Sequence, residues 1–436
     1  MTEEGSTPAP QRGAGTVAWT GSTYFAEGLP WSVLHQVASE FFTAAGLPAR
    51  QVGYTSALHA TGSLKFLWSP VVDLFGTLRQ WMIATQALLG ALMGLLAVLA
   101  HELFTAGSQD TTFIWVMLVG IGVASATHDI ACDGYYMDAL PKQAQARNVG
   151  VRVAAFRAAM FVGNSGLVYL AGRTSWLLGF GVAGAIMAAL AAGHWLWLPR
   201  VAGRARPVKA SEPAKTWDQR LSHVSEAYLS FFQMKHAALV VAFLLCFKLG
   251  DALLFNMSKV MLRDIGVSTA ERGAINGYGT AASIAGAILG GMWISRVSLT
   301  RALLPITLLM AVTHPLYLII AGSIVPMQAA VLADAPAYAV AHLAPSHLTI
   351  ASILVVEQFC GGMATAAQMV FLMSRCHPDH KAAHFAFGTA IYSLAQMITG
   401  SLSGHVYELQ GPLVYFALTC VACIPCVLLV RFVPTR

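Results

Sequence analysis

Charged side chains are scarce in this sequence. Asp, Glu, Lys and Arg make up 11% of its 436 residues, whereas 56% of the residues are hydrophobic. An average soluble domain carries about 25% charged residues. The deficit excludes an ordinary soluble protein, and the mean hydropathy of +0.63 predicts a chain that crosses a membrane many times.

Cysteine is also scarce, with seven residues that all fall in or at the ends of apolar segments. Cys420, Cys423 and Cys426 are regularly spaced, but no His or acid stands near them, so we interpret them as small packing residues. We expect no metal, no cofactor and no catalytic residue. No basic run is interleaved with aromatics, which excludes nucleic acid as a partner. Residues 1–16 are polar and predict a cytoplasmic tail without a cleavable signal peptide.

Apolar segments of membrane-spanning length fill the rest of the chain, at about 20 residues per span. The sequence therefore predicts an all-α membrane protein with twelve transmembrane helices in two six-helix pseudo-repeats. The expected domains are a tail at 1–16, an N-terminal half at 17–198, a cytoplasmic linker at 199–235 and a C-terminal half at 236–436. The segments lie near 17–42, 51–72, 80–100, 112–137, 147–170, 175–198, 236–262, 272–294, 300–322, 347–374, 382–404 and 411–433.

Basic residues set the expected orientation, because cytoplasmic loops are enriched in Lys and Arg. If the N-terminus is inside, most of the 26 Lys and Arg residues fall in cytoplasmic segments. The exceptions outside are Arg50, Arg173, Arg263 and Arg272, and those within apolar segments are Lys65, Arg152, Arg157, Lys248 and Lys259. We expect both termini and the linker to be cytoplasmic. Within the linker, 217–232 fits either an amphipathic surface helix or a solvated connector, and the external connection 323–347 is expected to be partly helical.

Two carboxylates stand in the fourth segment, in the stretch His128 to Asp138. Asp129 and Asp133 are four residues apart and share one helix face. A carboxylate at membrane depth normally faces a cavity or a partner. We interpret the two acids as proton-coupling groups that face a central cavity. The alternative is a solvated helix end.

The first segment carries Glu27 between residues that weaken helical hydrogen bonding, Gly28 and Pro30, which suits a helix that lines a cavity. Glu27 is a candidate proton carrier or a buried acid with a cationic partner. His35 lies eight positions on, roughly on the same face. Lys65 in the second segment either binds substrate or extends to the interface.

In the fifth segment Arg157 is deep and is a candidate anion-binding or charge-pairing group, whereas Arg152 is nearer the interface and is expected only to extend toward it. In the second half, Lys248 and Asp251 are three apart and can pair; a proton or substrate could open that pair. Glu357 is the acid of the tenth segment. The expected proton-coupling set is Asp129, Asp133, Glu27, Asp251 and Glu357, and the expected substrate-binding set is Arg157, Lys248, Lys65, His35, Tyr136 and Gln358.

The two halves resemble each other where their second helices end. Trp68 to Gly76, with Arg79 shortly after, and Gly290 to Arg296 both occupy a cytoplasmic turn. Parallel repeats around a central site are a transporter plan, so Asp73, Arg79 and Arg296 are expected at a cytoplasmic gate. His377, Asp379, His380 and His384 have metal-like spacing, but a solvated loop is the preferred interpretation.

These motifs together resemble the major facilitator superfamily, and within it the AmpG-type muropeptide permeases and the related acetyl-CoA transporters. The segments that carry the resemblance are Glu27 to Pro30, Lys65 to Asp73, His128 to Asp138, Lys248 to Asp251 and Glu357 to Met363. The resemblance implies a major facilitator fold and a proton-driven importer of anhydromuropeptides in a bacterial inner membrane, and we expect the protein to be a monomer.

Transport by alternating access is therefore the expected function, with a small-molecule substrate, protons and the bilayer as partners. Relatives often carry a lysine at the position of Tyr136 and a small residue at that of Glu27. A siderophore or an acyl-CoA-like solute is accordingly an alternative cargo. A membrane-embedded enzyme that uses the His377 to His384 cluster and a non-transporting sensor are the alternative functions.

Overall fold

A computed structural model gives the fold of residues 14–106, 110–200, 229–376 and 381–434, which are the residues described below. Within these ranges the chain is helical and contains no strand. Among the described residues, nine helices are long and apolar enough to cross a membrane. The all-α membrane fold is thus confirmed, while the number of twelve spans stays a prediction, because the stretches 14–44 and 49–74 are not among the nine.

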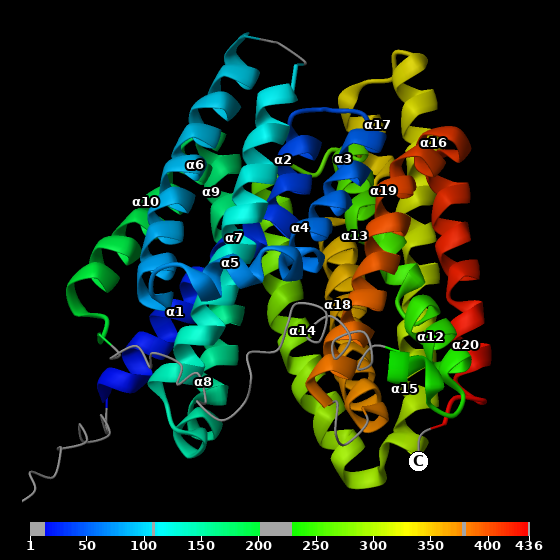
Figure 1. Ribbon diagram of the computed structural model, residues 1–436. Helices are drawn as coiled ribbons and strands as arrows, with labels where there is room; N and C mark the ends of the chain where they lie inside the picture. The colour runs from blue at the N-terminus through cyan, green and yellow to red at the C-terminus, as the bar shows by residue number, and fades with distance from the viewer. Residues whose placement is uncertain (1–13, 107–109, 201–228, 377–380, 435–436) are drawn as a thin grey trace, which may run out of the picture.

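The helices before residue 200 form one set, which we call the N-terminal group (Figure 1). Its elements are α1 (Ala14–Ser32), the π-helix η1 (Val33–Val37), α2 (Ala38–Ala44), α3 (Ala49–Tyr54), η2 (Thr55–Leu58), α4 (His59–Ser63), η3 (Lys65–Leu67), α5 (Ser69–Leu74), α6 (Leu78–Ala106), α7 (Thr112–Ala139), α8 (Lys142–Phe161), the π-helix η4 (Val162–Leu167), α9 (Val168–Arg173) and α10 (Trp176–Trp197).

The helices after residue 229 form the C-terminal group. Its elements are α12 (Ala237–Cys246), α13 (Leu249–Asp264), α14 (Thr269–Val297), α15 (Leu299–Thr313), η5 (His314–Leu316), α16 (Tyr317–Leu332), α17 (Ala337–Leu343), α18 (His347–Arg375), α19 (Lys381–Ala422) and α20 (Ile424–Leu429). Gly411, with φ of 74°, interrupts α19, and this is backbone that glycine adopts readily.

Local sequence explains where several of these helices begin. Ser268 and Glu271 form a reciprocal capping box that satisfies free N–H groups at the start of α14. Ser175 and Ser346 accept backbone hydrogen bonds at the starts of α10 and α18. The connection expected over 323–347 is largely helical, because α16 continues to Leu332 and α17 follows.

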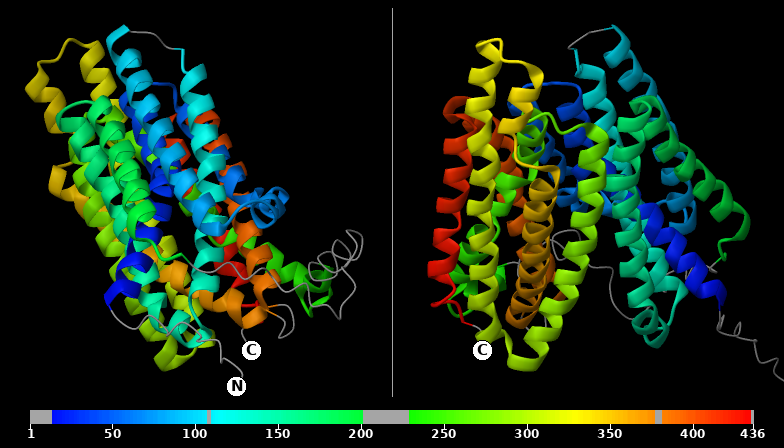
Figure 2. Two further views of the ribbon diagram at one scale, coloured as in Figure 1. Left: turned by 60° about the vertical axis from the view of Figure 1, so that its left-hand side comes forward. Right: turned by 180° about the vertical axis from the view of Figure 1, so that it is seen from behind.

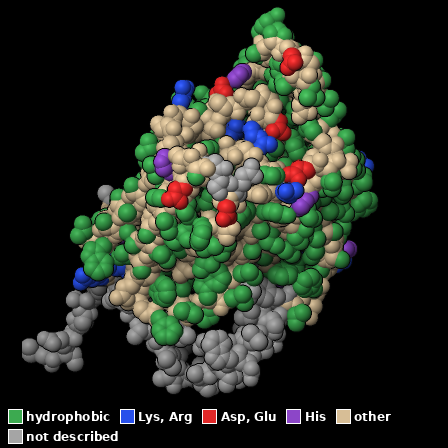
Figure 3. Space-filling view, turned by 90° about the horizontal axis from the view of Figure 1, so that it is seen from above, with side chains coloured by type: hydrophobic (Ala, Val, Ile, Leu, Met, Phe, Trp, Pro, Cys, Tyr) green, Lys and Arg blue, Asp and Glu red, His purple; other side chains and the backbone are tan. Residues whose placement is uncertain are grey.

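Both termini of the described chain lie at one end of the molecule, where α1 begins and α20 ends (Figure 2). We call this the terminal end. The hairpin of α16 and α17 projects at the other end, which we call the distal end (Figure 1). Viewed from the distal end, side chains of both charges lie on the exposed face (Figure 3). Arg50 in α3 and Glu408 in α19 form an exposed ion pair, with their charged groups 3.7 Å apart.

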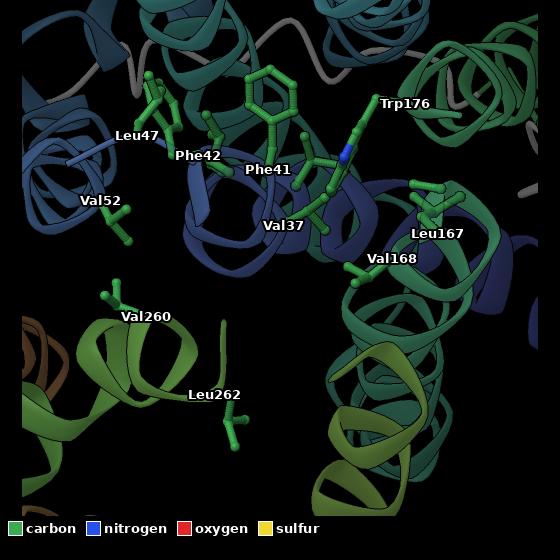
Figure 4. Close-up of a cluster of buried hydrophobic side chains, with 14 of the residues drawn as sticks. Val37, Phe41, Phe42, Leu47, Val52, Leu167, Val168, Trp176, Val260 and Leu262 are labelled. Carbon is green, nitrogen blue, oxygen red and sulfur yellow. The ribbon is translucent and has the colours of Figure 1, made fainter. Parts of the chain in front are cut away.

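Three clusters of buried hydrophobic side chains explain how the two groups meet. The largest contains residues of both groups, such as Phe41, Trp176 and Val260 (Figure 4). The other two clusters each belong to one group, around Phe243 in the C-terminal group and around Tyr135 in the N-terminal group.

Glycines bring backbones together near the distal end. A Cβ added at Gly404 in α19 would lie 2.1 Å from the carbonyl oxygen of Ala49 in α3. One added at Gly172 in α9 would lie 2.2 Å from the backbone nitrogen of Ala270 in α14. The groups therefore pack tightly toward the distal end, while toward the terminal end each has a core of its own.

The boundaries of the two pseudo-repeats stay a prediction. The tail at 1–16 and the linker at 199–235 lie mostly outside the described residues, as does most of the surface helix considered for 217–232.

Candidate functional site

A cavity of about 320 Å³ lies between the two groups. The N-terminal group lines it with residues of α1, η1, α4, α8 and η4, and the C-terminal group with residues of α13, α14, α18 and α19. A pocket at the interface of two helix sets, with a few polar groups converging in it, is the usual form of a small-molecule site.

Two π-helical turns help to build the N-terminal wall. Pro30 has no N–H to donate within α1, and the π-helix η1 begins three residues later. His35 and Gln36 belong to η1 and line the cavity, and Asn164 of η4 does the same. Such turns often occur at functional sites because they displace side chains from the regular helical register.

Aromatic rings cover part of the same wall. The imidazole rings of His35 and His59 stack with centroids 3.9 Å apart and an angle of 15° between their planes. The ring of Trp31 lies 4.7 Å from that of His35. All three residues line the cavity. The stacked imidazoles and the tilted Trp31 ring form an aromatic surface against which a ring or an apolar part of a ligand can pack.

The cations and acids expected at a substrate site divide between the cavity and other places. Arg157, Lys248, His35 and Gln358 line the cavity, as do Asp251 and Glu357. Lys65 and Tyr136 are absent from the lining. The Tyr136 hydroxyl instead donates to the carbonyl oxygen of Gln145 at 2.6 Å.

On the C-terminal wall, Lys248 and Asp251 form an ion pair with Nζ and Oδ2 2.9 Å apart. The Nε2 atom of His314 lies 3.5 Å from the other oxygen of Asp251. Glu357 accepts two hydrogen bonds at Oε2, one from the Tyr317 hydroxyl at 3.2 Å and one from Nε2 of Gln358 at 2.9 Å. The predicted pairing of Lys248 with Asp251 is therefore present in this structure.

Asp129 and Asp133 form a second charged cluster inside the N-terminal group. Lys65 forms an ion pair with Asp129. Nη2 of Arg152 lies 2.6 Å from Oδ1 of Asp133, the oxygen that also accepts a hydrogen bond from the Tyr24 hydroxyl at 2.6 Å. The interpretation of Arg152 as a side chain that only extends to the interface is wrong, because Asp133 holds its guanidinium.

Glu27 completes this cluster. Its carboxyl group contacts that of Asp129, and its Oε2 atom is buried with no hydrogen-bond partner among the described residues. The cluster thus contains three carboxyl groups but two cations. Neither Asp129 nor Asp133 is among the residues that line the 320 Å³ cavity, so their orientation toward a central cavity stays a prediction.

A third set of polar contacts closes the interface toward the distal end. Arg272 of α14 donates from Nε to Oε2 of Glu40 in α2 at 2.9 Å, and both side chains are almost completely buried. Asn276 donates to the other Glu40 oxygen at 2.9 Å. Lys259 of α13 donates to the backbone oxygen of Gln36 at 3.1 Å and to Oγ of Ser39 at 2.5 Å. These contacts join the two groups across the cavity's closed end.

The expected gate residues show different surroundings. Arg79 donates to the backbone oxygens of His194, Trp195 and Leu198, and so caps the end of α10 within the N-terminal group. The side chain of Arg296 is exposed. The side chain of Asp73 lies outside the described part of the chain. Their role in a gate stays a prediction.

The histidine cluster can be followed only at His384, because His377, Asp379 and His380 lie outside the described residues. His384 is buried in α19, with Nε2 2.8 Å from Oγ of Ser230. The interpretation of a solvated loop is therefore wrong for His384, which packs against the ring of Phe231. Over the described residues, no group of three or more potential ligands could hold a metal ion.

The family model of the Major Facilitator Superfamily matches residues 19–349. The chain is 26% identical over 415 residues to the "Anhydromuropeptide permease" of Escherichia coli (strain K12), covering 92% of this chain and 76% of that protein. It is 21% identical to "Putative transporter AmpG 4" of Rickettsia conorii, with 94% of each chain covered.

Solved structures with the same fold include two transporters. A bacterial homologue of the human lysosomal transporter Spinster, in an inward-facing and occupied conformation, has a TM-score of 0.61 at 15% identity and covers 98% of this chain and 95% of its own. The nucleoside transporter NupG has a TM-score of 0.62 at 14% identity and covers 95% of this chain and 98% of its own.

Proposed function

This chain belongs to the major facilitator superfamily, whose members are transporters rather than enzymes, and we propose that it imports anhydromuropeptides together with protons. The observation that carries the proposal is the guanidinium of Arg157, which lines the cavity without an acidic partner among the described residues. Arginine binds carboxylates in a bidentate way. A muropeptide supplies carboxylates, and the similarity to the Escherichia coli permease supports this cargo.

We further propose that cargo crosses by alternating access, with the two groups rocking about the cavity. Three features support this mechanism. Toward the distal end the groups share a hydrophobic core and the buried pair of Glu40 and Arg272. Toward the terminal end each group has its own core. If the distal contacts break and new contacts form near the terminal end, the cavity opens to the other side of the membrane.

Proton coupling is supported by the cluster of Glu27, Asp129 and Asp133. Each aspartate has one cationic partner, whereas Glu27 contacts another carboxyl group. Two carboxyl groups in contact repel each other when both are ionised, and a single shared proton removes that repulsion. Glu27 and Asp129 together are therefore suited to take up and release a proton during the cycle.

The chain is placed by this proposal in a bacterial inner membrane, as a monomer with both termini in the cytoplasm. The terminal end is then the cytoplasmic end, and the structure corresponds to a state closed on the outside. The excess of Lys and Arg in the segments expected inside supports this orientation.

Uptake into proteoliposomes tests the proposal. The purified protein is reconstituted, and entry of a radiolabelled anhydromuropeptide is followed with and without an inward proton gradient. We expect the gradient to drive accumulation that a protonophore abolishes. Absence of uptake above protein-free liposomes, in both conditions, would remove muropeptides as the cargo.

A further inference from the structure

The two walls of the cavity differ in charge. The N-terminal wall carries Arg157 and the rings of Trp31, His35 and His59. The C-terminal wall carries Lys248, Lys259, Asp251 and Glu357, together with amide and hydroxyl side chains. The pair of Lys248 and Asp251 is internally neutral. Arg157 on the first wall, and Glu357 and Lys259 on the second, form no ion pair with the described residues.

Arg157 is the cation of the first wall. No hydrogen bond or ion pair joins its side chain to the rest of the described chain. Arg152, five residues earlier on the same helix, differs because Asp133 neutralises it at 2.6 Å. A guanidinium that is partly removed from water is stabilised by an anion placed opposite its N–H groups. A carboxylate of the cargo has the geometry that this group requires.

Glu357 is the acid of the second wall. Both of its hydrogen bonds end on Oε2, so Oε1 has no hydrogen-bond partner in the part of the chain that the structure describes. Lys248 lies on the same wall, but its Nζ atom is occupied by Asp251 and by the carbonyl oxygen of Gly361 at 3.3 Å. Glu357 can therefore accept a further hydrogen bond from a cation.

Space is available beside this oxygen. Gly361 has no side chain, and a Cβ added there would lie 3.6 Å from Oε1 of Glu357 and 3.7 Å from Oδ2 of Asp251. Both carboxylate oxygens thus border the space that a side chain at position 361 would occupy. An ammonium group that entered it could interact with the two oxygens at once.

We propose that the cavity binds a zwitterionic cargo, with a carboxylate on Arg157 and an ammonium group on Glu357. This inference rests on the proposed function and names the charges that the cargo must carry. Lys259 is a further cation in the lining, but oxygens of Gln36 and Ser39 hold its ammonium group at the closed end. A cargo with only one of the two charges leaves either Arg157 or Glu357 without a partner, which is unfavourable for a charge withdrawn from bulk water.

The zwitterion also links the two groups. Arg157 belongs to α8 of the N-terminal group and Glu357 to α18 of the C-terminal group. A ligand that contacts both walls favours the conformation in which they lie at the matching separation. Recognition of both charges is therefore also a means by which cargo can influence the change between conformations.

The assignment is tested by combining chemical modification of the cargo with substitutions of Arg157 and Glu357. The cargo is an anhydromuramyl tripeptide that ends in diaminopimelate, whose side chain provides an ammonium group. It is compared with the same molecule acetylated on that amine and with its methyl-esterified form. Binding to the purified protein is measured by isothermal titration calorimetry for wild type, Arg157→Gln and Glu357→Gln. Arg147→Gln, an exposed position on the same helix as Arg157, is the control.

We expect acetylation and esterification each to weaken binding to wild type and to the control roughly 10- to 100-fold, the effect of a hydrogen bond to a charged group. Glu357→Gln should bind the free and acetylated amines equally, and Arg157→Gln should bind the acid and the ester equally. Thermal melting checks that each variant is folded.

Full discrimination by Glu357→Gln between the two amines, or by Arg157→Gln between acid and ester, overturns the assignment. If wild type binds none of the muropeptides, the proposed cargo is wrong. The same measurements are then made with a zwitterionic tripeptide, with its amine acetylated and with its carboxylate esterified. If the wild-type protein binds the free and the capped peptides equally, the assignment of the two charges to Arg157 and Glu357 is overturned as well.

Discussion

Glu40 and Arg272 form a buried ion pair at 2.9 Å although they are 232 positions apart and belong to different helix groups. Arg272 also donates to the carbonyl oxygen of Val267 in its own group at 2.7 Å. The hydrogen bonds of the Glu40 carboxylate, in contrast, come from Arg272 and Asn276 of the opposite group. The stability of the distal closure is therefore expected to depend on the charge of Glu40.

Glu40→Gln should open the distal end, because it leaves Arg272 buried without its anion. Loss of one partner of a buried ion pair costs about 3–5 kcal/mol, which is enough to change a two-state ratio more than a hundredfold. Spin labels are attached at the exposed positions Glu102 and Leu332, one in each group. Double electron–electron resonance spectroscopy then measures the distance between the two labels. We expect longer distances in the variant.

Arg50→Gln is the matched control, because it removes an exposed pair with Glu408 at the same end. Exposed pairs contribute roughly 0–1 kcal/mol, so the distances should stay as in wild type. Identical distance distributions in Glu40→Gln and Arg50→Gln would show that the buried pair does not hold the groups together.

Gly404→Leu should prevent closure at the distal end by a steric route. A Cβ at this position would meet the Ala49 carbonyl oxygen at 2.1 Å, and backbone atoms cannot move away as a flexible side chain can. The same pair of spin labels should again report a longer distance, with loss of uptake. Gly291→Leu is the control, since an added Cβ there meets nothing within 4 Å. Normal uptake by Gly404→Leu would contradict the close approach of α3 and α19.

Asp129→Asn should abolish proton-driven uptake and also lower the melting temperature, because Lys65 loses the carboxylate with which it pairs. Adding Lys65→Met removes the unpaired cation and should restore much of the melting temperature without restoring uptake. Thermal melting and uptake are measured on both variants. Full uptake by either one at every pH would exclude Asp129 from proton coupling.

Tyr24→Phe should destabilise the protein modestly. Its hydroxyl donates to Oδ1 of Asp133 at 2.6 Å, and such a bond to a charged group contributes about 1.5–3 kcal/mol. Arg152 remains on Asp133, so the fold should be kept. Tyr54→Phe removes a comparable hydroxyl contact with His405 at the exposed surface and is the control. Equal melting temperatures of the two variants would argue against a structural role of Tyr24 in the cluster.

Much of the fold is predictable because apolar runs bounded by charge form helices in a membrane whatever their neighbours are. The interruptions of the regular helical backbone are harder to predict from the sequence. Pro30 signals weakened hydrogen bonding, but nothing in the local sequence shows that a π-turn follows and directs His35 toward a cavity. The sequence predicts only partial helix over 323–347, because proline usually ends a helix, and it does not indicate that α16 continues to Leu332 through Pro326.

The charged residues show a similar limit. The sequence identifies Asp129 and Lys65 as polar residues at membrane depth, but their pairing joins segments 64 positions apart and depends on the packing of the helices. The sequence position of Arg152 near the interface predicts only a side chain that extends toward water. That position does not indicate the contact with Asp133, which depends on the packing of two helices. Glu40 was missed, although an acid between Ser39 and Phe41 in an apolar segment is itself a signal that a buried partner exists.

Cargo-induced proton movement tests the central claim most directly. Proteoliposomes that contain a pH-sensitive dye are prepared with equal pH on both sides, and an anhydromuropeptide is added outside. Coupled import predicts acidification of the lumen in step with cargo entry, with no response in protein-free liposomes. Cargo entry without any change in lumenal pH would contradict the proposed proton coupling.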